Sequence, residues 1–360
     1  MAAEHVHQTS VRAWLEAGEA QRLSPLAAQS ARARRDHADD DSGVRTSFQR
    51  DRDRILHTKA FRRLKHKTQV FIAPEGDHYR TRLTHTLEVT QIARTIARAL
   101  RLNEDLVEAI GLGHDLGHAP FGHAGETAIS HVLGHAFRHN EQSRRIVEVL
   151  EKGGAGLNLT WEVREGIALH SKTRKDIAAT AWGTASTLEG QIIKVADSIA
   201  YINHDIDDAL RAGVLAPNSL PPSTVEQLGA THGERINTMV CDLIEHNWWA
   251  TGEVPPPAQP IIGMSADILQ ATNELREFLF TNVYRASPAH DEDSRIRFMI
   301  DQLHTRFARD PELVPADLRR ISEGRGDSHE CAVIDYIAGM TDRYALKLFS
   351  DLFVPRGWRG

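Results

Sequence analysis

Imidazole and carboxylate side chains are concentrated in one short stretch of the sequence. Between Gly113 and Glu126, fourteen residues include three histidines, an aspartate and a glutamate, together with four glycines and a proline. Histidine and carboxylate groups bind divalent metal ions, and they also accept and donate protons near neutral pH. A His-Asp pair beside a glycine-rich turn is therefore typical of a site that holds a metal ion and a reactive water molecule.

The helix expected before this stretch carries a further histidine on its inner face. Between 81 and 100, apolar residues repeat at helical spacing, at Val89, Ile92, Ile96 and Leu100. His85 lies four residues before Val89, so one helical turn places its side chain on the same buried face.

The stretch itself is predicted to join two helices. Asn103 can cap a helix whose inner face is formed by residues spaced by four, namely Leu106, Ile110 and His114. Glycine and proline between 117 and 122 end that helix and turn the chain. A new helix can begin near His123, and Glu126 then points to the same side of its first turn.

A third helix carries acidic residues beside its core stripe. From 188 to 210 the stripe consists of β-branched residues, Ile192, Val195, Ile199, Ile202 and Ile206. Asp197, Tyr201 and Asp205 step by four along an adjoining face and stay aligned for about two turns.

These helices can bring together two imidazoles and two carboxylates, those of His85, His114, Asp115 and Asp197. Taken singly, each is more often a satisfied core polar group or a helix cap. Together they favour a metal site, because each lies on or beside a core stripe, where an unpaired charge is costly. The donor set suits Mn²⁺, Mg²⁺ or Fe²⁺, and without a thiolate it suits structural zinc poorly. Water bound to such an ion becomes more acidic, and the ion polarises a phosphoryl oxygen.

The composition is that of a globular protein rather than a membrane protein or a general nucleic-acid binder. The chain has 360 residues, 41% hydrophobic and 26% charged, with a net charge of -6. No apolar run reaches the ~20 residues that a membrane helix needs, and the N-terminus shows no apolar signal core. The two cysteines, Cys241 and Cys331, lack CxxC spacing and fit a reducing cytoplasm.

Helical patterns dominate the chain, and strand signals are sparse. We expect an all-α fold in three segments: a polar, partly flexible lead (1–44), a core (45–215) and a helical C-terminal region packing on it (216–360). Basic residues interleaved with apolar ones over 45–67 predict an amphipathic helix with one basic side. Further helix patterns cover 268–283, 295–307 and 331–353.

Several sequence strings resemble those of a known family. RTRLTHTLEV (80–89), HDLGH (114–118) and AD (196–197) resemble the H…HD…D pattern of HD-domain phosphohydrolases. More narrowly, the chain is similar to deoxyguanosinetriphosphate triphosphohydrolases, the dNTP triphosphohydrolases, through FQRDRDR (48–54), FRRL (61–64), KTQVF (67–71), FGHAGE (121–126), GLNLT (156–160), DIDD (205–208) and DYIAGMTD (335–342). The resemblance implies an HD-domain helical bundle with a helical C-terminal extension.

The resemblance also implies a reaction and a set of residues that perform it. The reaction is hydrolysis of a dNTP to deoxynucleoside and inorganic triphosphate, by metal-assisted attack of water on the α-phosphorus. The implied metal ligands are His85, His114, Asp115 and Asp197, and Co²⁺ or Ni²⁺ are further candidates for the ion. His123 matches the catalytic histidine and Glu126 the acid that orients it, which is sound because an imidazole can protonate a departing oxygen at neutral pH. His118 could contact the α-phosphate or act as the acid, and His139 is a weaker catalytic candidate.

Substrate contacts follow from the resemblance and from charge. A triphosphate needs counter-charge, and forked guanidinium groups suit phosphate oxygens, which makes candidates of Arg63, Arg80 and Arg82. Gln69 and Asp205 match positions that bind the 3′ hydroxyl. Tyr201 matches the residue that packs under the deoxyribose, where a 2′ hydroxyl would clash.

The resemblance implies partners as well, and rival functions stay open. Family members form homo-oligomers, often tetramers or hexamers, and some are activated by a dNTP effector. The rival enzymes are a nucleotide phosphodiesterase and a (p)ppGpp hydrolase. A nucleotide sensor or single-stranded nucleic-acid binder is the rival from another class, with the basic segment as a phosphate track for weak binding of single-stranded DNA.

Overall fold

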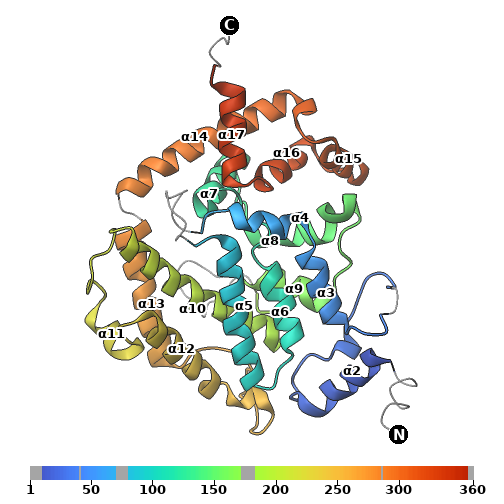
Figure 1. Ribbon diagram of the computed structural model, residues 1–360, viewed down its shortest axis with the longest axis vertical. Helices are drawn as coiled ribbons and strands as arrows, with labels where there is room; N and C mark the ends of the chain where they lie inside the picture. Colours follow the sequence, from blue (N-terminus) through green and yellow to red (C-terminus); the bar gives the residue numbers. More distant parts are fainter. Residues whose placement is uncertain (1–9, 40–41, 70–79, 172–182, 285–286, 356–360) are drawn as a thin grey trace. The chain divides into compact units, whose positions relative to one another are not determined.

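The computed structural model of the chain is helical, as expected (Figure 1). It describes residues 10–39, 42–69, 80–171, 183–284 and 287–355. Within these ranges, the regular structure other than helix is one isolated antiparallel bridge between Thr68 and Thr81. The all-α prediction is therefore confirmed. Val70 and Phe71 of the KTQVF string lie outside the described residues.

The described residues group into two compact units that are interleaved along the chain. The first unit comprises 1–57, 85–114 and 157–284, and the second comprises 58–84, 115–156 and 285–360. One boundary falls between His114 and Asp115. The division into the consecutive segments 1–44, 45–215 and 216–360 stays a prediction.

The first unit contains most of the long helices. They are α2 (Val11–Arg22), α3 (Ser47–Leu56), α5 (Arg82–Ala99, whose first turn belongs to the second unit), α6 (Glu104–Gly113), α9 (Trp161–Leu169), α10 (Leu188–Arg211), α11 (Pro222–Leu228), α12 (His232–His246) and α13 (Ala266–Leu279). Short helical turns are η1 (Ser30–Arg32), η5 (Trp248–Thr251) and η6 (Phe280–Tyr284). α6 packs against α3, α9 and α10.

The second unit contains the C-terminal helices and the segment that follows His114. Its helices are α4 (Lys59–Arg63), α7 (Gly122–Leu133), α8 (His139–Arg145), α14 (Ser287–Arg309), α15 (Ala316–Arg325), α16 (His329–Ala338) and α17 (Asp342–Phe353). The short turns are η2 (Leu64–His66), η3 (Ile146–Leu150), η4 (Glu151–Gly154) and η7 (Pro311–Leu313). α14 packs against α7 and α16, which surround a core of apolar side chains.

The helices that carry the candidate residues follow the expected caps and core stripes. The Asn103 side chain accepts hydrogen bonds from the first backbone N–H groups of α6, and Thr187 caps α10 in the same way. The predicted stripe residues of α5 and α10 are all buried. Gly111 lets α6 approach its neighbours closely, because a Cβ there would lie 2.6 Å from Thr90 Oγ1.

Two predicted helices are each divided in the structure, so those two predictions were wrong. The basic segment 45–67 forms α3 and α4, because Thr58 accepts a hydrogen bond from Phe61 N and starts a new helix. The segment 331–353 forms α16 and α17, because Thr341 caps the second helix. In both places the helical periodicity of the sequence continues past a threonine, but that threonine is the N-cap of a new helix.

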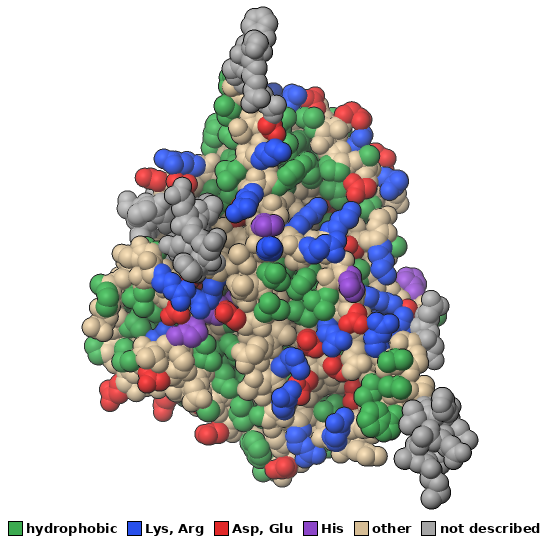
Figure 2. Space-filling view, viewed as in Figure 1, with side chains coloured by type: hydrophobic (Ala, Val, Ile, Leu, Met, Phe, Trp, Pro, Cys, Tyr) green, Lys and Arg blue, Asp and Glu red, His purple; other side chains and the backbone are tan. Residues whose placement is uncertain are grey.

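Within the part of the chain that the structure describes, every helix is too short or too polar to cross a bilayer. The face shown in Figure 2 carries lysine and arginine side chains interspersed with acidic ones.

Candidate functional site

His85, His114 and Asp197 come together in the first unit. His85 is on α5, His114 directly follows α6, and Asp197 is on α10. His85 Nε2 lies 3.1 Å from Asp197 Oδ1, and ring nitrogens of His85 and His114 lie within 4.8 Å of one another. Both imidazoles are buried, with exposed fractions of 1% and 0%. Three helices far apart in the sequence thus converge, as the core stripes predicted.

The hydrogen bonds of His114 fix which of its nitrogens can bind a metal. His114 Nδ1 lies 2.6 Å from the carbonyl oxygen of Gly111. A carbonyl only accepts, so Nδ1 carries the proton and the lone pair of the neutral ring is on Nε2. This is the arrangement by which proteins orient metal-binding histidines. His170, whose ring centroid is 4.9 Å from that of His114, makes the same kind of bond to Ile167 O.

The donor atoms of this unit fit a divalent metal ion. Neighbouring ligands of an octahedral ion with bonds of ~2.1 Å are separated by about 3 Å. The 3.1 Å between His85 Nε2 and Asp197 Oδ1 matches that spacing. Asp115 follows His114 in the chain, and its carboxylate lies 2.9 Å from Arg82 Nη1 and 3.2 Å from His118 Nε2. Imidazole with carboxylate suits a borderline to hard divalent ion.

In the second unit, Glu126 is shared by two histidines. Glu126 Oε2 lies 3.3 Å from His123 Nδ1, and Oε1 lies 3.2 Å from His139 Nδ1. The backbone N–H of His139 also donates to Glu126 Oε1, at 2.9 Å. The side chain of His123 is 60% exposed, whereas that of His139 is 13% exposed. One carboxylate therefore orients an accessible imidazole and a covered one.

His118 is placed differently from these two histidines. Its ring stacks on that of His139 with a centroid distance of 3.9 Å, and its Nε2 lies 3.2 Å from Asp115 Oδ1. Burial, with Arg82 and His139 nearby, lowers the pKa of His118 well below its usual value. A neutral His118 gives its Nε2 proton to Asp115, and among the described residues Nδ1 has no hydrogen-bond partner. His118 is thus a poor proton donor near neutral pH.

The His139–Glu126 pair behaves as an ion pair. Burial acts to lower the pKa of His139, but the Glu126 carboxylate overcomes this effect and raises the pKa above its usual value. Burial likewise acts to raise the pKa of Glu126, but His139 and His123 hold that pKa far below the usual range. The charged forms of His139 and Glu126 therefore stabilise each other.

We expect this ion pair to make the stability of the metal-free protein depend on pH. The pKa of His139 is raised in the folded chain above the value of 6.5 for an ordinary histidine. Its contribution is therefore complete below pH ~6.5 and is lost as the pH rises through the folded-state value. With EDTA present, the melting-temperature deficit of His139→Gln against the wild type should be largest near pH 6 and should shrink toward pH 9. The exposed His135 is the control, and His135→Gln should show no such trend; a pH-independent deficit for His139→Gln would contradict the ion pair.

The predicted phosphate-binding residues of the second unit are in unlike environments. Arg82 is buried rather than solvated, and its Nη1 lies 2.9 Å from Asp115 Oδ2. Among the described residues, Arg82 Nε and Gln69 Oε1 are buried without a hydrogen-bond partner. Arg80 is half-buried and Arg63 is exposed. Of the three arginines, Arg82 is therefore the one that the fold itself orients.

The turn before α7 is held by residues from the C-terminal region. Phe121 adopts a left-handed conformation (φ +65°), which is uncommon for a non-glycine residue. Its N–H donates to Asp342 Oδ1 at 2.9 Å, and Thr68 N–H donates to Asp342 Oδ2 at 2.8 Å. Lys67 Nζ donates to the carbonyl oxygens of His118 and Ala338, and burial lowers the pKa of Lys67 to about 7. Asp342 and Lys67 thus hold the backbone of the segment that carries His118 and His123.

Replacing Asp342 by asparagine should destabilise this unit. The carboxylate is 4% exposed and accepts bonds on both oxygens, whereas asparagine offers one oxygen and one NH₂ group. One buried N–H would then face another donor, which costs about 1–3 kcal/mol. Urea denaturation measures the loss. The matched control is Asp351→Asn, at an exposed position of the same helix. If both changes lowered the free energy of unfolding equally, the two hydrogen bonds accepted by Asp342 would not be important for stability.

Tyr201 and Asp205 of the first unit lie beside a tyrosine that the sequence did not single out. Tyr284 donates its hydroxyl proton to Asp205 Oδ2, and its ring centroid is 6.1 Å from that of Tyr201. Burial and the Asp205 carboxylate raise the pKa of both tyrosines well above the usual value. Two neutral tyrosines thus flank a buried carboxylate.

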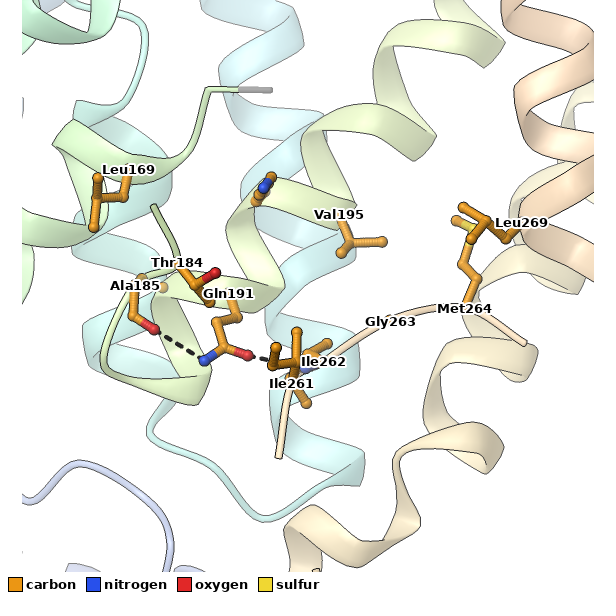
Figure 3. Close-up of a pocket in the computed structure, with 12 residues that line it drawn as sticks. Leu169, Thr184, Ala185, Gln191, Val195, Ile261, Ile262, Gly263, Met264 and Leu269 are labelled. Atoms are coloured by element: carbon orange, nitrogen blue, oxygen red, sulfur yellow. Dashed lines mark hydrogen bonds between the residues drawn. The ribbon is translucent and has the colours of Figure 1, made fainter. Parts of the chain in front are cut away.

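A well-formed pocket in the first unit lies elsewhere. Figure 3 shows Gln191 of α10 spanning it, with Nε2 donating to Ala185 O and Oε1 accepting from Ile262 N, each at 2.9 Å. The lining is mainly apolar and contains none of the predicted site residues. The pocket is therefore separate from the histidine cluster.

Several polar residues around the site escaped sequence reasoning. They are Lys67, Glu88, His170, His204, Tyr284 and Asp342. Lys67, Glu88 and Asp342 lie within the quoted family strings, and His204 directly precedes another. These four could have been flagged as polar residues in or beside a conspicuous string, whereas His170 and Tyr284 lie in none of the strings.

Comparisons with known proteins find family matches and relatives over most of the chain. The HD domain family matches residues 82–202, and the phosphohydrolase-associated domain family matches residues 262–351. A deoxyguanosinetriphosphate triphosphohydrolase-like protein from Caldanaerobacter subterraneus subsp. tengcongensis is 54% identical over 93% of this chain and 94% of its own length. Another protein of that description, from Desulfatibacillum aliphaticivorans, is 46% identical over 96% of this chain and 99% of its own. The crystal structure of a hypothetical protein from Aquifex aeolicus has a TM-score of 0.45 and 16% identity, covering 85% of this chain and 68% of that one, which is too low to carry an argument.

Proposed function

Because the chain belongs to the deoxyguanosinetriphosphate triphosphohydrolase-like family of HD-domain phosphohydrolases, we propose that it hydrolyses dNTPs to deoxynucleoside and inorganic triphosphate. Membership of this family makes the chain an HD-type hydrolase. The proposed reaction is supported above all by one observation: His85 Nε2 and Asp197 Oδ1 lie 3.1 Å apart, and His85 and His114 are both buried.

The proposed metal ligands are His85, His114, Asp115 and Asp197. Mn²⁺ and Mg²⁺ are the preferred ions for this donor set, with Fe²⁺, Co²⁺ and Ni²⁺ as further candidates. When bound, such an ion lowers the pKa of water and polarises the α-phosphoryl oxygen. The role of the protein is to orient the ligands: the Gly111 carbonyl fixes the His114 tautomer, and burial keeps bulk water from His85 and His114.

His123 is the proposed proton donor to the departing 5′ oxygen. Its Nδ1 faces Glu126, so a protonated ring keeps one N–H on the carboxylate and can release the Nε2 proton. His139 holds Glu126 from the other side and would act by orienting it. His118, kept neutral and bonded to Asp115, is assigned to the surroundings of the α-phosphate rather than to proton donation.

The triphosphate would be bound by basic residues and the sugar by a polar, aromatic group. Arg82 is the principal candidate for a phosphate contact, with Arg63 and Arg80 as further counter-charge. Gln69 and Asp205 are proposed to bind the 3′ hydroxyl. Tyr201 would pack under the deoxyribose and exclude a 2′ hydroxyl, and Tyr284, bonded to Asp205, would hold that carboxylate in place.

The rival functions predict different products or none. A phosphodiesterase would cleave a cyclic nucleotide, and a (p)ppGpp hydrolase would release pyrophosphate. A sensor or single-stranded nucleic-acid binder would leave a dNTP intact. The combination of a buried metal-type donor set with a carboxylate-oriented, exposed His123 favours a hydrolase.

The test is product analysis with each of the four dNTPs, alone and in pairs, with Mn²⁺. Ion-exchange chromatography and ³¹P NMR should show inorganic triphosphate and deoxynucleoside in equal amounts, and the pairs report activation by an effector dNTP. A GTP control should give little product if Tyr201 excludes ribonucleotides. Release of orthophosphate or pyrophosphate instead of triphosphate would overturn the proposal.

We further propose a homo-oligomer, a tetramer or a hexamer, located in the cytoplasm. The support is family membership, and the test is the molar mass in solution, with and without dNTP. We also propose weak binding of single-stranded DNA through the basic segment, which a salt-dependent binding assay with an oligonucleotide would test.

A further inference from the structure

A second buried histidine, His204 of α10, faces His85 from the side away from Asp197. His85 Nδ1 lies 3.2 Å from His204 Nδ1, while His85 Nε2 lies 3.1 Å from Asp197. The two rings meet edge to face, at 5.4 Å and 85°. His204 Nε2 in turn lies 2.6 Å from Glu88 Oε2 on α5. Both imidazoles are 1% exposed, whereas the Glu88 side chain is 41% exposed.

With a metal ion between His85 Nε2 and Asp197, these contacts favour one tautomer of each ring. Glu88 Oε2 lies 2.6 Å from His204 Nε2, and a carboxylate so close favours a proton rather than a lone pair on that nitrogen of a neutral ring. The Nδ1 atom of His204 is then an acceptor, and the only group of His85 that can donate to it is Nδ1–H. His85 then has its lone pair on Nε2, where it can bind a metal ion held between His85 and Asp197. The opposite tautomer of His85 would set the Nδ1 lone pairs of the two rings against each other across 3.2 Å. The favoured tautomer sets the Nε2 lone pair against the Asp197 carboxylate at 3.1 Å, and a metal ion between them would relieve that repulsion.

We propose that Glu88 and His204 are positioning residues that hold His85 in the Nε2 tautomer required of a metal ligand. This inference rests on the proposed function, because it deepens the role assigned to His85. Carboxylates and carbonyls commonly orient metal-binding histidines directly, and His114 uses the Gly111 carbonyl in that way. For His85 the carboxylate of Glu88 acts indirectly, because the imidazole of His204 lies between the two side chains.

If Glu88 and His204 only stabilised the fold, their variants would behave differently from those of a positioning relay, by which we mean the contacts from Glu88 through His204 to His85. A structural role would show in the stability of the protein, and any side chain that filled the space would satisfy it. A positioning role requires an acceptor at the location of His204 Nδ1. The asparagine oxygen is bonded to Cγ, as Nδ1 is in histidine, so asparagine provides an acceptor at the same location. The glutamine oxygen lies one bond further out, near the location of Nε2, so glutamine leaves no acceptor at the location of Nδ1.

The experiment measures Mn²⁺ affinity of the full-length chain by EPR of free Mn²⁺, without substrate. Loss of such an orienting contact costs about 10- to 100-fold in metal affinity. We expect His204→Leu and His204→Gln to weaken Mn²⁺ binding by that amount and His204→Asn to recover most of it. The matched control is His232→Gln, because the His232 ring stacks on that of His204 with a centroid distance of 6.0 Å, while His232 Nδ1 lies 3.1 Å from Asp207 Oδ2. That variant should bind Mn²⁺ as the wild type does.

A second pair of variants keeps the test decisive if the buried leucine prevents folding. Glu88→Gln retains an acceptor for His204 Nε2–H, so its Mn²⁺ affinity should stay near that of the wild type. Glu88→Leu should weaken Mn²⁺ binding at least ~3-fold; this effect is smaller than that of the His204 variants because Glu88 contacts His204 rather than His85. Unchanged affinity in Glu88→Leu, or equal affinities of His204→Asn and His204→Gln, would overturn the relay. A wild-type chain that binds no Mn²⁺ would overturn the metal assignment as well, so the two failures are distinguishable.

Discussion

Replacing Asp197 by alanine is expected to empty the metal site and to lower triphosphate release by at least ~10³-fold, because a metal-assisted hydrolysis loses both its activated water and its phosphoryl polarisation. Asp197 Oδ1 lies 3.1 Å from His85 Nε2, so its loss removes one of two neighbouring donor atoms. Metal content after gel filtration and steady-state rates with dGTP, at saturating Mn²⁺, measure the two effects. Both should fall together.

The matched control for this change is on the same helix. Asp207 is also on α10, but its Oδ2 lies 3.1 Å from His232 Nδ1, and it belongs to none of the donor sets described above. Asp207→Ala should therefore keep its metal and most of its rate. Full metal content in Asp197→Ala would show that the proposed ligand set is wrong, whatever the rate.

Replacing His123 by alanine should lower kcat by about 10²- to 10⁴-fold and leave the metal content intact. The expected loss is that of one general acid, since the side chain is 60% exposed and contributes little packing. Because His123 would act only as the 5′ oxygen departs, KM should change far less than kcat. Steady-state kinetics with analysis of the triphosphate product measure both constants.

His131 provides the control for this second change. It is exposed on the same helix α7 and bonds Arg297 rather than Glu126. His131→Ala should leave kcat unaltered. If His123→Ala released triphosphate at the wild-type rate, another group would have to be the acid; the lowered pKa of His118 makes that residue a poor replacement.

The sequence by itself determined which residues would face inward on the main helices. His85, His114 and Asp197 could be selected because each lies on or beside a repeating apolar stripe, which marks a face of the helix that packs against the core. The caps were readable for the same reason: Asn103 and the turn after Gly117 act within a few residues of chain. The pair His123 and Glu126 also depends only on a spacing of three within one helical turn, and the structure brings them to 3.3 Å.

Only the tertiary structure decided how these residues are paired. The sequence predicted Lys67 on a basic helix face and Arg82 as a phosphate contact, yet both side chains are buried. Arg82 Nη1 lies 2.9 Å from Asp115 Oδ2, and Lys67 Nζ donates to the carbonyl oxygen of Ala338, far away in the chain. Thr58 and Thr341 are N-caps of new helices at positions where the periodicity of the sequence predicted one continuous helix. The sharing of Glu126 between His123 and His139, and the contact of His204 with His85, join residues 13 and 119 positions apart. Periodicity describes one helix at a time, whereas a hydrogen bond between two imidazoles depends on where two helices meet.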